Sequence, residues 1–213
     1  MFRHTQVLID LDAIRNNYAI LKNNVPPHVR VMPVVKADAY GHGMLPVAKA
    51  LERIGATDFA VALPEEGVAL REGGVSADIL VLGAATERAA GEAVRHRLAQ
   101  TVFTPDMVAL LNGEARRQGT TALVHIKLDT GMNRIGLRTA EEAARLAAAL
   151  KAAPYVRAVG VYTHFADADG ADAAFTQEQF QRFEALTALL PRGIVRHAAN
   201  SAAIHRYAAT HLD

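Results

Sequence analysis

The chain has 213 residues, of which 51% are hydrophobic and 21% charged, and its formal net charge is +1. This composition is typical of a globular domain rather than a disordered chain, and the balanced charge does not favour binding to nucleic acid or to an anionic membrane. The chain has no cysteine, which excludes disulfides, thiolate metal ligands and cysteine nucleophiles.

Residues 1–24 are predicted to form a leader, in which Thr5–Ile9 is a strand and Asp10 caps a helix that runs to about Asn24. Asp10 and Asp12 interrupt the apolar residues before they reach the length of a signal peptide. No stretch approaches the roughly 18 consecutive apolar residues of a membrane span. We therefore expect a cytoplasmic protein that does not contact a membrane.

Residues 25–213 are predicted to consist of repeated strand and helix units, because short apolar runs alternate with longer helical patterns. The predicted strands are Val31–Val35, Phe59–Ala62, Ile79–Leu82, Thr101–Phe103, Ala122–Leu128, Val156–Thr163 and Val195–His197. The predicted helices are Leu45–Ile54, Pro64–Glu72, Glu87–Arg97, Pro105–Gln118, Ala140–Ala152, Thr176–Leu190 and a short helix after Asn200. Pro64 and Pro105 suit first helical turns, and Thr139 followed by Glu142 resembles a capping box.

This α/β pattern is compatible with a closed barrel or with an open doubly wound sheet. No glycine-rich turn of the dinucleotide-binding type follows the first predicted strand, which favours a TIM-type (β/α)8 barrel. Seven of the eight strands of such a barrel are found. No linker divides the chain, so we expect one domain over residues 1–213, with the leader at 1–24 and an incomplete barrel at 25–213.

Polar residues lie along or at the end of three predicted strands. In the fifth strand, His125, Lys127 and Asp129 share one face, and the alternate residues on the other face are apolar. Lys36 and His164 each close another strand. Because helices cover the outside of a βα barrel, we expect these polar groups to converge inside, at the C-terminal rim where such barrels carry their chemistry.

Each of these residues also has a structural interpretation. Lys36 could extend to solvent, His164 could be a hydrogen-bonded core histidine, and Lys127 could pair with Asp129. A lysine that is shielded from water tends towards the neutral amine, which attacks an aldehyde. The convergence of three strands therefore favours chemistry at Lys36.

Asn200 and Ser201 follow the last predicted strand, at the start of a short helix. Helix N-terminal amides attract anions, and the loops after the last two strands of such barrels commonly bind phosphate. Either residue could instead only cap the helix. Together with a lysine across the barrel, the two residues favour a phosphate-bearing ligand.

Four segments resemble sequence signatures of alanine racemases, in the order in which that family carries them. Val34–Gly43 (VVKADAYGHG) is similar to the motif around the cofactor lysine, and Lys127–Gly136 (KLDTGMNRIG) is similar to a second long motif. Thr163–Asp169 and Ala199–Ala203 are similar to two further signatures. With the leader, the resemblance covers essentially the whole chain.

The resemblance implies an enzyme that uses pyridoxal 5'-phosphate to interconvert L-alanine and D-alanine, and so supplies D-alanine for cell-wall synthesis. It implies that Lys36 carries the cofactor covalently and moves a proton at the substrate Cα. Arg134 would bind the substrate carboxylate and the cofactor's phenolic oxygen, and Lys127, carbamylated in many family members, would orient Arg134. The other residues implied to bind the cofactor are Tyr40, Asn200 and Ser201 at the phosphate and His164 beside the pyridine ring.

The resemblance also implies parts that these residues do not include. After Asp213 the family continues with a strand whose arginine bonds the pyridine nitrogen, and with a C-terminal β domain whose tyrosine serves the opposite face of the substrate in a homodimer. We therefore expect this chain to be part of a racemase and to racemise alanine slowly by itself, because losing one positioned acid or base costs about 10² to 10⁴ in rate. The sequence does not distinguish alanine from serine as the substrate.

Two other functions agree with part of the pattern. A single-domain pyridoxal-phosphate carrier matches the length, but a carrier has no substrate carboxylate for Arg134 to hold. A metal-dependent hydrolase would use His125, Asp129 and His164 as ligands, but it leaves Lys36 without a role. The sequence therefore favours the racemase and predicts no metal site.

Overall fold

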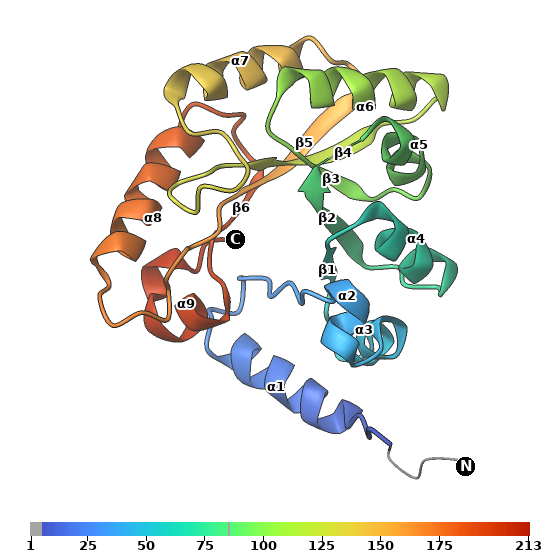
Figure 1. Ribbon diagram of the computed structural model, residues 1–213, viewed down its shortest axis with the longest axis vertical. Helices are drawn as coiled ribbons and strands as arrows, with labels where there is room; N and C mark the ends of the chain where they lie inside the picture. The colour runs from blue at the N-terminus through green and yellow to red at the C-terminus, as the bar shows by residue number, and fades with distance from the viewer. Residues whose placement is uncertain (1–5, 85) are drawn as a thin grey trace.

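The computed structural model describes residues 6–84 and 86–213. Its six strands are parallel and form one sheet, in which each strand pairs with the next along the chain. The strands are β1 (Asp58–Val61), β2 (Asp78–Ala84), β3 (Ala99–Val102), β4 (Ala122–Lys127), β5 (Val156–Tyr162) and β6 (Val195–His197). Figure 1 shows that the sheet is curled and that helices surround its outer side. The architecture is a half-barrel, which confirms the predicted α/β barrel class.

Apart from α2, which the sequence did not predict, the helices agree with the sequence prediction, with ends that shift by a few residues. They are α1 (Leu11–Asn23), α2 (Lys36–Gly41), α3 (Met44–Glu52), α4 (Pro64–Glu72), α5 (Glu87–Arg95), α6 (Pro105–Arg117), α7 (Ala140–Lys151), α8 (Ala174–Thr187) and α9 (Ser201–Arg206), followed by a 3-10 turn at Ala208–Thr210. Asp10 caps α1, Pro64 and Pro105 open α4 and α6, and Thr139 forms a capping box with Glu142. Within the described residues, no helix has the length and apolar character needed to cross a membrane.

The first predicted strand, Val31–Val35, is wrong as an extended strand. Only Val34 forms a bridge, parallel to Ala60 of β1, so the described sheet has six strands rather than seven. The Val35 amide donates to the Ala60 carbonyl at 2.8 Å, and the Ala60 amide donates to the Pro33 carbonyl at 2.9 Å. Pro33 has no N–H to donate, and the chain leaves the sheet at α2. The pairing therefore stops after one residue.

The predicted leader strand is also wrong for the residues that can be judged. Thr5 lies outside the described residues, and residues 6–9 form no strand. Val7 and Leu8 are 83% and 82% exposed, so no neighbouring strand covers them. An extended segment without a paired neighbour gains no ladder hydrogen bonds, which explains why the apolar pattern alone did not produce a strand.

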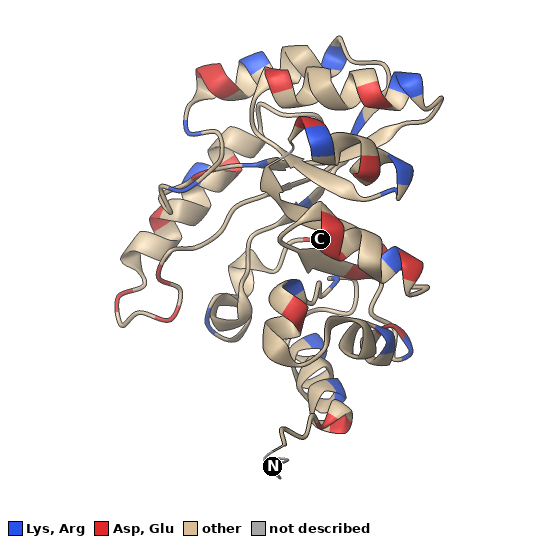
Figure 2. Cartoon of the chain, turned by 45° about the vertical axis from the view of Figure 1, so that its right-hand side comes forward, with Lys and Arg blue, Asp and Glu red and all other residues tan. Residues whose placement is uncertain are grey.

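Alternating side chains of the strands enter two different cores. Val124, Ile126 and Leu128 are fully buried between the sheet and the surrounding helices, and each such side chain contributes about 1.5–3 kcal/mol. His125 and Lys127 point to the inside of the curl, where Tyr162 packs with small apolar residues of β1, β2 and β3. The predicted alternation in this strand is confirmed. Figure 2 shows that acidic and basic residues are interspersed along the outer helices.

Asp213 links the two edges of the curled sheet. Its amide donates to the carbonyl of Arg196 in β6 at 3.2 Å, and its carbonyl accepts from the amide of Arg30 at 3.3 Å. Arg30 lies just before the Val34 bridge, on the other side of the opening. The backbone hydrogen bonds of Asp213, together with helix packing, therefore hold the two edges of the curled sheet close to each other.

Candidate active site

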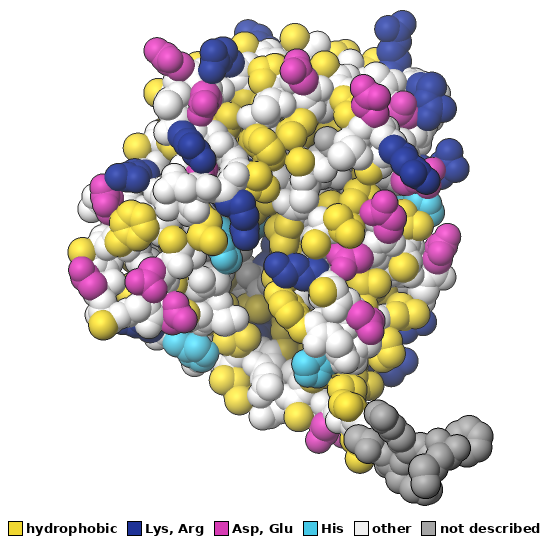
Figure 3. Space-filling model, in the orientation of Figure 1, with side chains coloured by type: hydrophobic (Ala, Val, Ile, Leu, Met, Phe, Trp, Pro, Cys, Tyr) yellow, Lys and Arg dark blue, Asp and Glu magenta, His cyan; other side chains and the backbone are white. Residues whose placement is uncertain are grey.

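The residues predicted to carry chemistry lie at the C-terminal ends of the strands. Lys36 follows the Val34 bridge, Lys127 ends β4, and His164 lies just beyond β5. Asn200 and Ser201 follow β6. Because parallel strands share their C-terminal edge, these residues border one rim. Figure 3 shows a central hollow on this face of the molecule, bordered by basic and histidine side chains.

His164 lies among three cationic side chains. Burial lowers its pKa from the usual 6.5, and the positive charges of Arg134, Lys127 and Lys36 lower it further. These cations border the same rim as His164, and their charges disfavour the protonated imidazole. The arrangement brings together four of the predicted residues and favours the neutral form of His164.

Lys127 is the most buried of these cations, with a 3% exposed surface. Burial, opposed by the charge of Asp129 and reinforced by that of Arg134, lowers its pKa from 10.5 to about 8. Its Nζ donates to the carbonyl of Leu128 and lies 5.4 Å from the centre of the Tyr162 ring. The alternative in which Lys127 pairs with Asp129 is wrong, because the Asp129 carboxylate pairs with Arg138 at 3.0 Å.

Asp129 holds the loop that carries Arg134. Its Oδ1 accepts the amides of Gly131 at 3.2 Å and Asn133 at 2.9 Å, and these bonds hold the pKa of the carboxyl below its usual range despite burial. Gly136 adopts a φ of +127°, and a Cβ there would lie 2.6 Å from the Asp129 nitrogen. Only glycine permits this close return of the loop to β4. Arg134 is exposed on the loop.

The metal-site alternative has no support in this geometry. The Asp129 carboxylate is occupied by the loop amides and Arg138, and the Nδ1 of His125 lies 2.9 Å from the Nε2 of His197. Across residues 6–84 and 86–213, no group of histidine and carboxylate side chains is arranged to hold a metal ion.

Lys36 begins a left-handed turn. Ala37, Asp38, Ala39 and Tyr40 have φ angles of 50, 53, 53 and 56°, a conformation that residues other than glycine rarely adopt. The Lys36 Nζ lies 5.9 Å from the centre of the Tyr40 ring, and Tyr40 is 62% exposed. The turn therefore presents the amine and the phenol side by side.

Asn200 is the N-cap of α9, which agrees with the capping role considered for it from the sequence. Its Oδ1 accepts the Ala203 amide at 3.0 Å. Ser201 is the first residue of the helix and is exposed.

An interior network was not predicted from the sequence. The ring of Tyr162 stacks on His197 with a centroid distance of 4.9 Å and an interplanar angle of 6°, and its hydroxyl lies 2.9 Å from the Thr101 Oγ1. Burial lowers the pKa of His125 to about 4 and raises that of Tyr162 to about 12. The alternation of side chains along the strands could have indicated this network, because these residues occupy inward positions on neighbouring strands. His125 aligns with Thr101, and Tyr162 aligns with His197.

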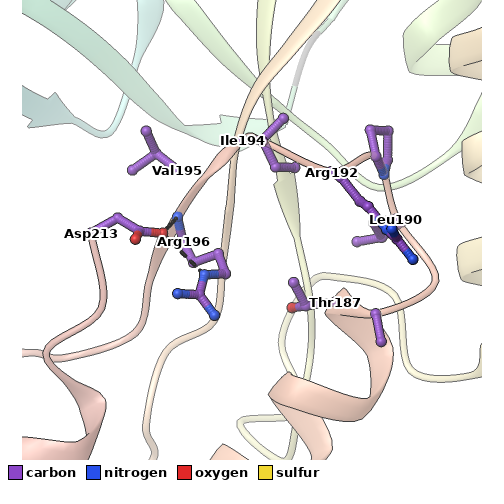
Figure 4. A pocket seen from close by; sticks show the side chains of 10 residues that line it. Thr187, Leu190, Arg192, Ile194, Val195, Arg196 and Asp213 are labelled. Carbon is purple, nitrogen blue, oxygen red and sulfur yellow. Dashed lines mark hydrogen bonds and ion pairs between the residues drawn. The ribbon is translucent and has the colours of Figure 1, made fainter.

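A second hollow of about 550 Å³ lies between the end of α8 and β6 and contains none of the predicted site residues. Figure 4 shows Asp213 and Arg196 beside it, joined by a hydrogen bond from the Arg196 amide at 2.9 Å and an ion pair at 3.0 Å. Arg196 and Asp213 pair with each other here, and the hollow contains none of the strand-end residues, so the rim around His164 is the better candidate for chemistry.

Comparisons with known proteins agree with this assignment. A family model described as "Alanine racemase, N-terminal domain" matches residues 9–213. Alanine racemase 2 of Oceanobacillus iheyensis is 39% identical over 215 residues, covering 100% of this chain and 55% of that protein. The solved alanine racemase of Clostridium difficile 630 has a TM-score of 0.92 at 33% identity, covering 98% of this chain and 57% of that one. The alanine racemase of Bacillus anthracis with bound L-Ala-P has a TM-score of 0.92 at 38% identity, covering 100% and 56%.

This chain therefore spans about half the length of the relatives it matches. The match extends over the strands, the rim and the loop of Arg134, and it favours the racemase lineage over the carrier alternative. On the sequence match and the shared fold together, the chain belongs to the alanine racemase family, of which it carries the N-terminal domain.

Proposed function

We propose that this chain is the cofactor-binding barrel of an alanine racemase that uses pyridoxal 5'-phosphate, with Lys36 and Arg134 as catalytic residues. The observation that carries the proposal is the placement of Lys36, Lys127 and His164 at the C-terminal rim of the sheet, next to the loop of Arg134. The alanine racemase relatives, one of them with bound L-Ala-P, support alanine as the substrate.

The donor set at the rim fits a ligand that carries an aldehyde and a phosphate. Lys36 offers a primary amine to the aldehyde, and the neighbouring cations attract the phosphate and the substrate carboxylate. In the described part of the chain, no carboxylate lies within ion-pair distance of Lys36, Lys127 or Arg134. When bound, pyridoxal phosphate supplies a conjugated ring that delocalises the electron pair left at the substrate Cα.

The residues divide the work between proton transfer and binding. Lys36 would serve one face of the substrate, accepting the Cα proton in one direction of the reaction and donating a proton in the other, and Arg134 would bind the carboxylate and so orient the substrate. His164, whose pKa is lowered by burial and by its cationic neighbours, would support the cofactor ring without adding charge. Tyr40 and Ser201 bind the phosphate, and Asn200 fixes the start of α9 beneath it.

Lys127 is a positioning residue for Arg134. As an ammonium it repels Arg134, which contributes to its lowered pKa. Carbamylation of Nζ, which the family resemblance implies for many members, would replace this repulsion by attraction and hold Arg134 over the substrate. A pKa of about 8 leaves about a tenth of the amine neutral at pH 7, far more than an unshifted lysine would have, and this neutral form is the one that reacts.

Racemisation needs a second acid on the face opposite Lys36, because the proton must return from the other side. We propose that a tyrosine of a β domain in the second subunit of a homodimer fills this role.

Trapping of the cofactor tests the assignment. The protein is incubated with pyridoxal phosphate, reduced with borohydride and digested, and the labelled peptide is sequenced. We expect the label on Lys36, its loss in Lys36→Ala, and no change in Lys49→Ala, a half-buried lysine on α3. Labelling of another lysine at the same level would rule out the site.

A further inference from the structure

Glu66, in the first turn of α4, connects two separate parts of the rim. Its Oε1 accepts the amide of Ala37 at 2.6 Å, and its Oε2 accepts the amides of Ala62 at 2.7 Å and Leu63 at 3.0 Å. Ala37 directly follows Lys36, whereas Ala62 and Leu63 follow β1. One carboxylate therefore ties the backbone of the candidate cofactor lysine to the end of the neighbouring strand.

Helix capping accounts for only part of this arrangement. Leu63 is the N-cap of α4, and a glutamate at the third helical position commonly accepts the N-cap amide. The Ala37 amide comes from a segment 29 residues earlier in the chain and contributes nothing to the helix end. Both hydrogen bonds at 2.6 and 2.7 Å have the short lengths of charge-assisted bonds.

The contact falls at the start of the strained left-handed turn. The far end of this turn is fixed by Asp38, whose Oδ1 accepts the Met44 amide at 2.7 Å and whose carbonyl accepts the Gly43 amide at 2.9 Å. At the near end, the Ala37 amide is held by Glu66. Left-handed conformations of residues other than glycine persist only where their surroundings fix them.

We propose that Glu66 is a positioning residue for Lys36: by holding the Ala37 amide, it fixes the left-handed turn so that the Lys36 amine and the Tyr40 phenol face the rim. This inference rests on the proposed function, because it concerns the same lysine. It adds a residue that touches neither cofactor nor substrate and acts through the backbone.

The test uses the complete holoenzyme and three variants. Glu66→Gln keeps the shape of the side chain, but its amide nitrogen cannot accept a hydrogen bond, so one set of contacts is lost. Glu65→Gln removes the same charge from an exposed neighbour in the same turn. Pro64→Ala weakens the start of α4 without removing the Ala37 contact. The readouts are the Kd for pyridoxal phosphate, the absorbance of the Lys36-bound cofactor, the rate of borohydride trapping at saturating cofactor, and thermal unfolding.

We expect Glu66→Gln to weaken cofactor binding about tenfold, the equivalent of one charge-assisted hydrogen bond, and to slow trapping at Lys36. Both controls should keep the parent's Kd, trapping rate and spectrum, even where Pro64→Ala lowers the unfolding temperature. Equal Kd, trapping rate and spectrum in Glu66→Gln and the parent would overturn the proposal and leave Glu66 as a helix cap. Absence of Lys36 labelling in the parent itself would refute the proposed function instead.

Hydrogen exchange in the unmutated protein gives a second test that does not depend on a variant that folds. Ala37 is exposed, so its amide would exchange rapidly without a partner. We expect it to be protected to the same degree as amides at the ends of β1. Exchange at the rate of a free amide would contradict the proposal.

Discussion

Charged residues form ion pairs in one region of the curled sheet and lack carboxylate partners in another. At the N-terminal ends of the strands, Arg30 pairs with Asp58 at 3.0 Å. Near the closure of the curl, Arg196 pairs with Asp213 at 3.0 Å. Each of these cations has an anionic partner within the chain.

At the C-terminal rim, the cations lie close to one another instead. Lys36, Lys127 and Arg134 together lower the pKa of His164, and within residues 6–84 and 86–213 none of the three lies within ion-pair distance of a carboxylate. Like charges that cluster without a partner cost stability, and an anion that binds there recovers it. The comparison teaches that the fold pairs its charges near the closure of the curl and leaves them without a carboxylate partner at the rim, which is where we propose that a phosphate and a carboxylate bind.

The largest effect is expected from removing the central amine of the rim. In the complete enzyme, Lys36→Ala should lower racemisation by about 10² to 10⁴, because one positioned base is lost. Folding should be unaffected, since Lys36 is only half-buried. Circular dichroism of alanine solutions gives the rate, with Lys151→Ala, an exposed lysine at the end of α7, as the control. Parent-level turnover in Lys36→Ala would show that Lys36 is not the catalytic base.

The interior between the two ends should make the fold sensitive to acid. The pKa of His125 falls from 6.5 to about 4 through burial and the charge of Arg30. Between these pH values the unfolded chain binds more protons than the folded one, so stability decreases as pH falls from 6.5 to 4, by about 3 kcal/mol for this group.

Urea unfolding at several pH values measures this dependence. We expect His125→Gln to reduce it but not to abolish it, because burial also lowers the pKa of His197 well below 6.5. His28→Gln, at an exposed histidine, should leave it unchanged. Equal pH dependence in the parent and in His125→Gln would show that the interior histidine does not resist protonation.

Arg134 should affect turnover more than cofactor retention. Arg134→Ala in the complete enzyme should lower turnover about 10- to 100-fold, the range of a hydrogen bond to a charged group, and leave the Kd for pyridoxal phosphate close to that of the parent. It should also raise the pKa of His164, because one of its three cationic neighbours is removed. Steady-state kinetics and NMR titration measure the two effects, with exposed Arg116→Ala as the control. An unchanged His164 pKa in Arg134→Ala would show that the charge of Arg134 does not act on His164.

The paired end should respond in stability alone, and with the smallest effect. Asp58→Asn removes the charged partner of Arg30 and weakens the bond from the Thr57 hydroxyl, so we expect a loss of about 1–2 kcal/mol in the free energy of unfolding, with no change in cofactor binding. Asp78→Asn is the matched control, because Asp78 is exposed and aligned with Asp58 on the next strand. A weaker affinity for the cofactor in Asp58→Asn would show that the Arg30–Asp58 pair affects the rim as well as stability.

The sequence by itself determined the α/β class and the described helices other than α2. Proline and capping signals act within one turn, and the alternation of Val124, His125 and Ile126 reflects the two faces of a single strand. Such local signals need no knowledge of the rest of the fold. The order of the motifs then placed Lys36, Lys127 and His164 at strand ends, where the structure has them.

Only the tertiary structure decided which polar groups meet. The first predicted strand is reduced to a bridge at Val34, because strand formation depends on a paired neighbour, whereas the apolar pattern describes only the segment itself. Asp129 turned to Arg138 rather than to Lys127, since the return of the loop at Gly136 brought Arg138 within reach. The contact of Glu66 with Ala37 joins segments far apart in the chain, and no local spacing encodes such a contact.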